Sequence, residues 1–322
     1  MIRLALTLAI VGVIIWQLGG LGEVSQIILK MDPRYVLLGI LLMTLDRALM
    51  TYKWVRLLRG RGVHLPFFLG MQIYCAAMIW GMLLPATMGA DAIRAFSTSR
   101  KGFNSNDVVA SIIIERMVGF LAVLLLGFFS LVLLSASGAL DERFNFVWLV
   151  SAAVLLAGTL AFAVSFSRGA FELIHSRILY RFQEKGLFRR LRQFHETYMA
   201  YQDDKANLAL FFGLTFLEQL VPILFTWLLV IGLRIQTNML FVAGVVPLTL
   251  LISRIPVTID GLGVYDGIFA LLMSMGGATA AQAIAITLLG RIIQIIVWLP
   301  WWAAYVIGSG SIRPPKAVPK GG

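Results

Sequence analysis

The chain has 322 residues, of which 59% are hydrophobic and only 13% are charged. A soluble globular domain is about 25% charged, so this composition excludes the soluble class and indicates a polytopic membrane protein. The net charge of +11 predicts basic loops beside the bilayer rather than nucleic-acid binding, because Lys and Arg gather in cytoplasmic loops and attract anionic lipid. The single cysteine, Cys75, excludes an intramolecular disulfide, and the three histidines are too scattered for a metal site. We expect no metal and no cofactor.

Six apolar stretches are long enough to cross a bilayer, which takes about 20 residues. They are residues 2–20, 34–58, 108–137, 146–166, 207–233 and 278–308. The first stretch could also pass for a signal peptide with Arg3 as its basic end. Because it lacks a convincing small-residue cleavage site before Gly19, we expect a retained first helix.

Two further apolar stretches, residues 66–101 and 238–276, each contain a break with the pattern apolar-Pro-x-Thr-apolar. The two copies of the pattern are residues 84–88 and 255–259. Unsatisfied backbone groups survive at membrane depth only where protein or a water-filled cavity covers them. One such break in each half of a chain is typical of a transporter binding site. We expect two re-entrant helical hairpins; the alternative is eight ordinary helices with proline kinks.

The distribution of cations predicts how these segments are oriented. Basic residues flank 66–101 on both sides, so this hairpin should enter from the cytoplasm, and 238–276 should enter from outside. The units 34–137 and 207–308 then form an inverted repeat, whose site lies near the membrane midplane. The predicted fold is an all-α polytopic membrane protein with about six full transmembrane helices and two re-entrant hairpins. We expect it in the inner (plasma) membrane, with both termini cytoplasmic.

We expect residues 1–310 to form one integral membrane domain, followed by a short basic cytoplasmic tail at 311–322. The polar segment 168–206 is predicted to be cytoplasmic and to form two amphipathic helices. Its cations between Arg177 and Arg192 alternate with apolar stripes, an arrangement that favours the bilayer interface and anionic headgroups. The alternative is that this helix pair packs on the bundle.

Ionisable residues at membrane depth cost about 2.5–3.5 kcal/mol each on insertion scales, so they indicate functional positions. Arginine binds phosphate through paired hydrogen bonds, and helix N-termini expected near Asp91 and Gly263 favour anions. We predict that eight residues bind substrate: Asp91, Arg94, Arg116, Arg254, Asp260, Asp266, Arg291 and Gln294. Glu115 and Glu218 are predicted to gate the site or carry protons. The alternative is a set of ion pairs that only hold the bundle together, and Asp46 and Arg47 fit either reading.

Four motifs occur in a fixed order along the chain: Lys53-Trp54-Val55-Arg56, Leu84-Pro85 with Asp91-Ala92-Ile93-Arg94, Glu115-Arg116-Met117-Val118-Gly119, and Gly261-Leu262-Gly263-Val264-Tyr265-Asp266. Over nearly its whole length the chain resembles the flippase-like membrane domain of lysylphosphatidylglycerol synthases. The resemblance implies a polytopic inner-membrane protein that moves lipids between leaflets or helps to move them. Two departures stand out, because Asp260 replaces a usual glycine and Asp266 stands where Glu is common. The extra carboxylate argues against a second site that binds only anions.

The leading hypothesis is therefore a lipid transporter, not an enzyme, whose substrate has a phosphate-bearing or otherwise polar headgroup. No soluble aminoacyltransferase domain follows residue 308 in this sequence, so synthesis of lysylphosphatidylglycerol is not expected. Two alternatives belong to other classes: a scaffold that partners a lipid-synthesis enzyme, and an intramembrane enzyme that modifies a lipid. The second is disfavoured because the sequence contains no Ser/His/Asp set, no metal-ligand spacing and no nucleotide motif.

Overall fold

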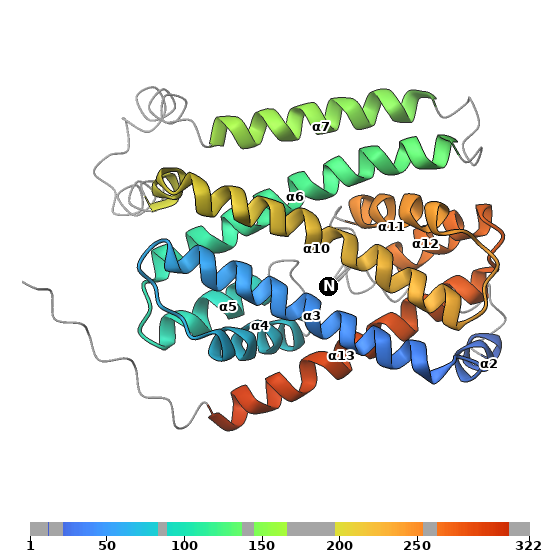
Figure 1. Cartoon of the computed structure of the whole chain (residues 1–322), viewed down its shortest axis with the longest axis horizontal. Helices are drawn as coiled ribbons and strands as arrows, with labels where there is room; N and C mark the ends of the chain where they lie inside the picture. Colours follow the sequence, from blue (N-terminus) through green and yellow to red (C-terminus); the bar gives the residue numbers. More distant parts are fainter. Residues whose placement is uncertain are drawn as a thin grey trace, which may run out of the picture.

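In a computed structural model the protein is a bundle of α-helices (Figure 1). The structure describes Gly12 and residues 22–82, 89–136, 145–165, 197–253 and 263–308. Every element within these ranges is helical, which confirms the predicted all-α class for this part of the chain.

Five helices are long: α3 (Pro33–Arg59), α6 (Ser105–Ala136), α7 (Asn145–Ser165), α10 (Lys205–Gly232) and α13 (Ala280–Gly308). Helices α3, α6, α10 and α13 meet both the length and the apolarity needed to cross a membrane. Helix α7 has 21 residues and is about 31 Å long at 1.5 Å per residue. The five helices agree with five of the predicted spans, and the sixth, 2–20, lies outside the described residues.

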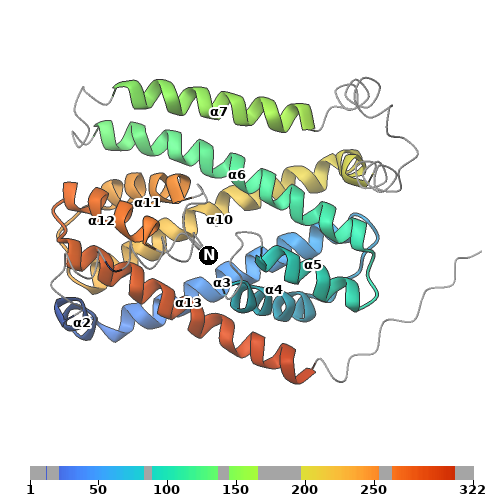
Figure 2. The ribbon, with the colours of Figure 1, turned by 180° about the vertical axis from the view of Figure 1, so that it is seen from behind.

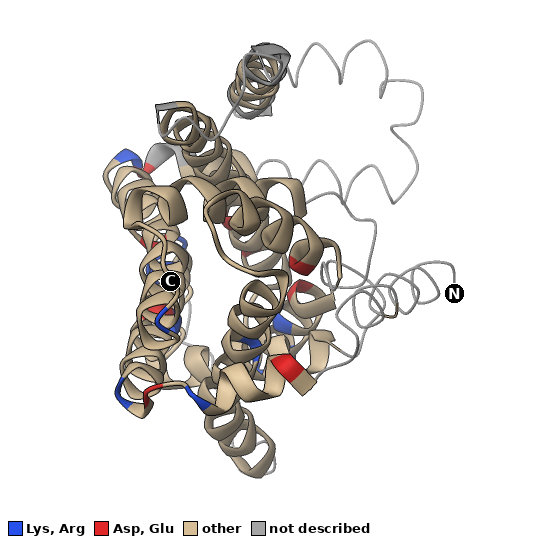
Figure 3. Ribbon diagram, turned by 90° about the vertical axis from the view of Figure 1, so that its right-hand side faces the viewer, with Lys and Arg blue, Asp and Glu red and all other residues tan. Residues whose placement is uncertain are grey.

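Helix α3 illustrates why these segments begin and face as they do. Asp32 caps its N-terminus, where the carboxylate accepts a hydrogen bond from the Arg34 backbone N–H at 2.9 Å, and Pro33 occupies the first helical position. Farther along, Leu37, Leu41 and Leu45 recur every four residues and are all more than half exposed. A stripe of exposed leucines suits a lipid environment, and viewed end-on the bundle carries charge at only scattered positions (Figure 3).

Four helices are too short to cross a hydrocarbon core of about 30 Å. They form two contacting pairs: α4 (Phe67–Met82) with α5 (Gly89–Arg100), and α11 (Met239–Ser253) with α12 (Val264–Met275). With 12 to 16 residues each, they are about 18–24 Å long. The first pair occupies one half of the long axis of the bundle and the second pair the other half (Figures 1 and 2).

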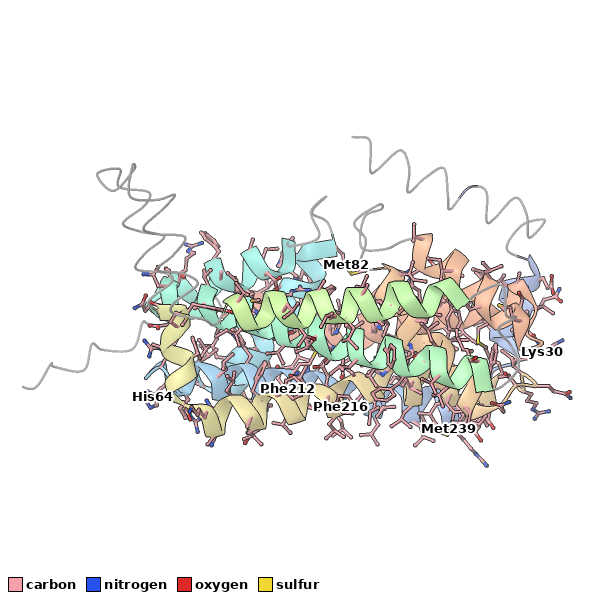
Figure 4. The ribbon with its side chains drawn as sticks, turned by 90° about the horizontal axis from the view of Figure 1, so that it is seen from above. Lys30, His64, Met82, Phe212, Phe216 and Met239 are labelled. Atoms are coloured by element: carbon pink, nitrogen blue, oxygen red, sulfur yellow. The ribbon has the colours of Figure 1, made fainter. Side chains whose placement is uncertain are left out.

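The side-chain view gives the same arrangement for the first pair. His64, just before α4, lies at one end of the molecule, whereas Met82, the last residue of α4, lies near the middle (Figure 4). Lys30 and Met239, the first residue of α11, lie towards the opposite end. The chain therefore runs from one end to the interior along α4.

The helix contacts of the two halves correspond one to one. Helix α4 packs on α13 as α11 packs on α6; α3 contacts α4 as α10 contacts α11; and α3 and α10 contact each other. The interval from Gly89 to Val264, and from Ser105 to Ala280, is 175 residues, so α5 and α12, and likewise α6 and α13, begin at the same register. Helices α3 to α6 and helices α10 to α13 are thus arranged alike, and we call these two sets of helices the first and second units.

The remaining elements lie at the periphery of these two units. Helix α2 (Gly22–Leu29) packs on α13, and α7 packs on α6. The short turn η4 (Ala200–Asp203) contacts α10, and Tyr201 within it is buried, with its hydroxyl donating to the Asp107 carbonyl at 3.2 Å. Burial raises the pKa of Tyr201, so this hydroxyl stays protonated.

The described end of the segment predicted to be amphipathic packs on the protein. Tyr198 and Tyr201, near the end of this segment, are buried, and the Tyr198 hydroxyl lies 3.1 Å from the Met117 sulfur. For these two residues the bundle-packing alternative holds. The cations from Arg177 to Arg192 lie outside the described residues, so their interfacial role stays a prediction.

Candidate substrate site

A cavity of about 360 Å³ lies among α3, α4, α5, α6, α10 and α13. Five charged side chains line it, two carboxylates and three cations: Glu115, Glu218, Arg47, Lys53 and Arg116. The amides of Gln219 and Gln294 also line the cavity, and neither is hydrogen-bonded to another described residue. The rest of the wall is mainly Met and aromatic side chains, so the cavity combines an apolar surface with a few polar groups.

Lys53 and Glu218 form an ion pair between the two units. The Lys53 ammonium contacts Glu218 Oε2 and donates a hydrogen bond to Thr215 Oγ1 at 3.0 Å. Lys53 is only 1% exposed and lies over the ring of Phe211. Within the described part of the chain this is the ion pair that connects the first unit to the second.

Arg94, predicted to hold a headgroup, is instead enclosed by protein. Its guanidinium donates to Glu115 Oε2 at 2.6 Å and to Oε1 at 3.3 Å, and lies 4.6 Å from the ring centroids of Trp54 and Tyr74. The Tyr74 hydroxyl also donates to Glu115 Oε1, at 2.8 Å. Arg94 is 1% exposed and does not line the cavity, and its hydrogen bonds hold Glu115 in place at the cavity wall.

Arg116 is the accessible arginine of this cluster. Its Nε donates to Asp91 Oδ2 at 2.7 Å, while its two terminal amines make no hydrogen bond to a described residue. The side chain is 45% exposed and lines the cavity. Asp91 was expected at the N-cap, but α5 begins at Gly89, so Asp91 lies in the first turn and its carboxylate binds Arg116 instead.

The second unit contains an equivalent pair. Arg291 Nη2 donates to both oxygens of Asp266, at 3.0 and 3.1 Å, and the Gly263 N–H donates to Asp266 at 2.9 Å. Asp91 and Arg116 are 25 residues apart, and so are Asp266 and Arg291. Asp266 therefore follows Asp91 by 175 residues, and Arg291 follows Arg116 by the same interval. This interval also separates the starts of α5 and α12.

Among the described residues, the charges that line the cavity and those of their ion-pair partners balance. The four cations are Arg47, Lys53, Arg94 and Arg116, and the four carboxylates are Asp46, Asp91, Glu115 and Glu218. Each cation contacts a carboxylate, including Arg47, whose Nε donates to Asp46 at 3.0 Å. Pairing of this kind offsets the desolvation cost of burying charge.

The structure brings together part of the predicted site. Asp91, Arg94, Glu115 and Arg116 form one cluster; Glu218 and Gln294 reach the same cavity from α10 and α13. Asp266 and Arg291 form a separate pair, and Arg291 does not line the cavity although Gln294, one turn on, does. Arg254 and Asp260 lie outside the described residues.

Comparison with known protein families identifies the family of this chain. The family model "Lysylphosphatidylglycerol synthase TM region" matches residues 1–301. The chain belongs to this family. The resemblance drawn from the four sequence motifs is thereby confirmed.

Similar proteins of the same kind occur in archaea. UPF0104 membrane proteins of Methanothermobacter thermautotrophicus, Methanocaldococcus jannaschii and Pyrococcus horikoshii are 25%, 21% and 22% identical to the chain. The matches cover 91%, 89% and 89% of the chain, and 89%, 88% and 90% of the respective relatives. These relatives are thus membrane proteins of similar length throughout.

Among the charged and amide side chains of the cavity wall, sequence reasoning in this family member missed Lys53 and Gln219. Lys53 opens the first of the four motifs, which was a signal, but it stands near the end of the predicted span 34–58 and was not assigned to the site. Its partner lies 165 residues away, and no sequence pattern links them. Gln219 was noted beside Glu218 only as part of a polar spot.

Proposed function

We propose that this protein moves a polar-headed lipid between the leaflets of the cell membrane, with the headgroup held in the cavity and the acyl chains in the bilayer. The observation that carries the proposal is the charged lining of a cavity inside a bundle of membrane-length helices. Charged side chains at membrane depth are costly and mark substrate pathways. The volume of about 360 Å³ lies within the range of about 300–1,000 Å³ typical of small-molecule sites.

The proposal includes the membrane topology. The α4–α5 pair enters from the cytoplasmic side and α11–α12 from the outside, with both chain termini cytoplasmic. The short helix lengths, the placement of the two pairs in opposite halves and the matching contacts of the two units all support this topology. In inverted-repeat transporters, one unit rocks against the other around a fixed central site. The Lys53–Glu218 pair joins the two units, so such a movement would change the distance between its partners.

A glycine in the cavity wall provides a direct test. Gly119 lines the cavity, and a Cβ added there would meet nothing within 4 Å, so Gly119→Phe should fill the cavity without disturbing the fold. Gly213 also has free space around it, but it is exposed on α10 outside the cavity, so Gly213→Phe is the matched control.

The measurement uses vesicles of phosphatidylethanolamine and phosphatidylglycerol that carry a trace of either lipid with a fluorescent tail. A membrane-impermeant reductant bleaches the outer leaflet, and further bleaching reports lipid arriving from the inner one. We expect the wild type and Gly213→Phe to accelerate this further bleaching. Vesicles with Gly119→Phe should bleach as slowly as vesicles without protein. A wild type without effect would overturn the function; an active Gly119→Phe would overturn the role of the cavity.

A further inference from the structure

Among the described residues, the charged side chains that line the cavity and the charged side chains paired with them sum to zero. Each of the four cations in and around it contacts a carboxylate. The separate pair of the second unit, Asp266 with Arg291, is also neutral. From this balance we infer that the cavity selects a zwitterionic headgroup, one with both a phosphate and an ammonium group, over a headgroup of net charge. This inference rests on the proposed function and specifies its substrate class.

The reason is electrostatic. In a site of low dielectric, each charge must be compensated nearby, and an uncompensated one is strongly unfavourable. A headgroup with net charge −1 or +1 brings such a charge into a site that is already balanced. A zwitterionic headgroup adds one charge of each sign and leaves the total at zero. The balance thus works as discrimination against both anionic and cationic lipids.

The cavity also offers an accessible group for each end of such a headgroup. The terminal amines of Arg116 have no described hydrogen-bond partner and suit a phosphate, which arginine binds through paired donors. Glu218 lines the cavity and contacts Lys53 through Oε2, while Oε1 has no described hydrogen-bond partner and suits an ammonium group.

Two unpartnered amides point to the same occupant. Gln219 is 8% exposed, Gln294 is partly buried, and both line the cavity without a hydrogen bond to another described residue. Buried polar side chains are nearly always hydrogen-bonded, so these amides are positioned for a polar ligand. An uncharged headgroup could bind the two amides, but it would pair with neither the Arg116 guanidinium nor the Glu218 carboxylate.

The experiment compares three tail-labelled lipids in the same vesicles of equal parts phosphatidylethanolamine and phosphatidylglycerol. The probes are phosphatidylethanolamine, phosphatidylglycerol and a diacyl trimethylammonium lipid, which are zwitterionic, anionic and cationic. We expect the wild type to move the first about tenfold faster than either other probe, which corresponds to about 1.4 kcal/mol. Equal or reversed rates, with movement still blocked by Gly119→Phe, would overturn the substrate class and leave the proposed function standing. Movement of no probe would overturn both.

Charge variants make the inference sharper. Glu218→Gln gives the cavity a net charge of +1, so the preference should shift at least about tenfold towards phosphatidylglycerol. Arg116→Gln gives −1 and should shift it towards the cationic lipid; Asp91 then keeps Arg94 at 3.9 Å as a partner, so this variant should fold. Lys53→Met with Glu218→Gln restores neutrality and should restore the preference for the zwitterion. If the headgroup ratios are the same in all variants, charge balance does not set selectivity.

Discussion

Lys53 of α3 and Glu218 of α10 form an ion pair that joins the two units at the wall of the cavity. Both partners are largely buried, with side-chain exposures of 1% and 12%. Removing one member of a buried pair leaves a charge uncompensated, whereas removing both does not. The pair is therefore a point at which the stability of the bundle and the charge of the cavity are coupled.

The first prediction concerns this coupling. Lys53→Met should lower the free energy of unfolding by about 3–5 kcal/mol, because Glu218 remains buried without its partner. The double variant Lys53→Met with Glu218→Gln should recover most of that loss. Thermal unfolding in one detergent measures all three proteins. A double variant as unstable as the sum of the two single variants would show that the side chains do not interact.

The second prediction separates two arginines that the sequence treats alike. Arg94→Lys loses the paired hydrogen bonds to Glu115 and the stacking on Trp54 and Tyr74, and should cost about 2 kcal/mol or more of unfolding free energy. Arg116→Lys, at a half-exposed position, should cost less than about 1 kcal/mol. Thermal unfolding of the two variants decides between them. The interpretation fails if the order of the losses is reversed.

The boundaries of the long helices could be predicted because membrane length and apolarity fix them locally. The predicted span 278–308 and the helix Ala280–Gly308 differ by two residues at one end and by none at the other. The predicted breaks at residues 84–88 and 255–259 lie outside the described residues, between the described helices α4 and α5 and between α11 and α12, so their form stays a prediction.

The site could be predicted only in part, because the role of a charge depends on what packs against it. Arg94 looked like a ligand-binding residue, yet Trp54 and Tyr74 from other helices enclose it, and hydrophobic patterning does not reveal that contact. The 25-residue spacing shared by the pairs Asp91–Arg116 and Asp266–Arg291 was present in the sequence. Its meaning required the contacts, because many acidic and basic residues share a spacing by chance.

The third prediction uses two glycines that both line the cavity. A Cβ at Gly81 would lie 2.7 Å from the Ala90 Cβ and 2.8 Å from its backbone nitrogen, so Gly81→Ala must separate α4 from α5. This overpacking should cost about 1–3 kcal/mol of unfolding free energy. Gly119→Ala meets nothing within 4 Å and should stabilise its helix by up to about 1 kcal/mol. Equal thermal stability of the two variants would contradict the close approach of α4 and α5.

The fourth prediction tests the topology through the single cysteine. Cys75 is buried, so Cys75→Ala provides a cysteine-free background in which single cysteines can be placed at exposed positions. His64→Cys and Ser105→Cys flank the first helix pair, and Gln236→Cys and Ala280→Cys flank the second. A re-entrant hairpin returns to the side from which it enters, so both of its flanks lie on one face of the membrane. The two members of each pair should therefore react with an impermeant thiol reagent from the same face.

The four single-cysteine variants also test the relation between the two units. In sealed vesicles of one orientation, the His64 and Ser105 positions should react from one face only, and the Gln236 and Ala280 positions from the other. Permeabilised vesicles, in which all four positions should react, provide the control for accessibility. If the flanks of one pair react from opposite faces, that pair spans the membrane and the eight-helix alternative is correct. If all four react from one face, the hairpins are re-entrant but the repeat is not inverted, and movement of one unit against the other could not expose the cavity to the two leaflets in turn.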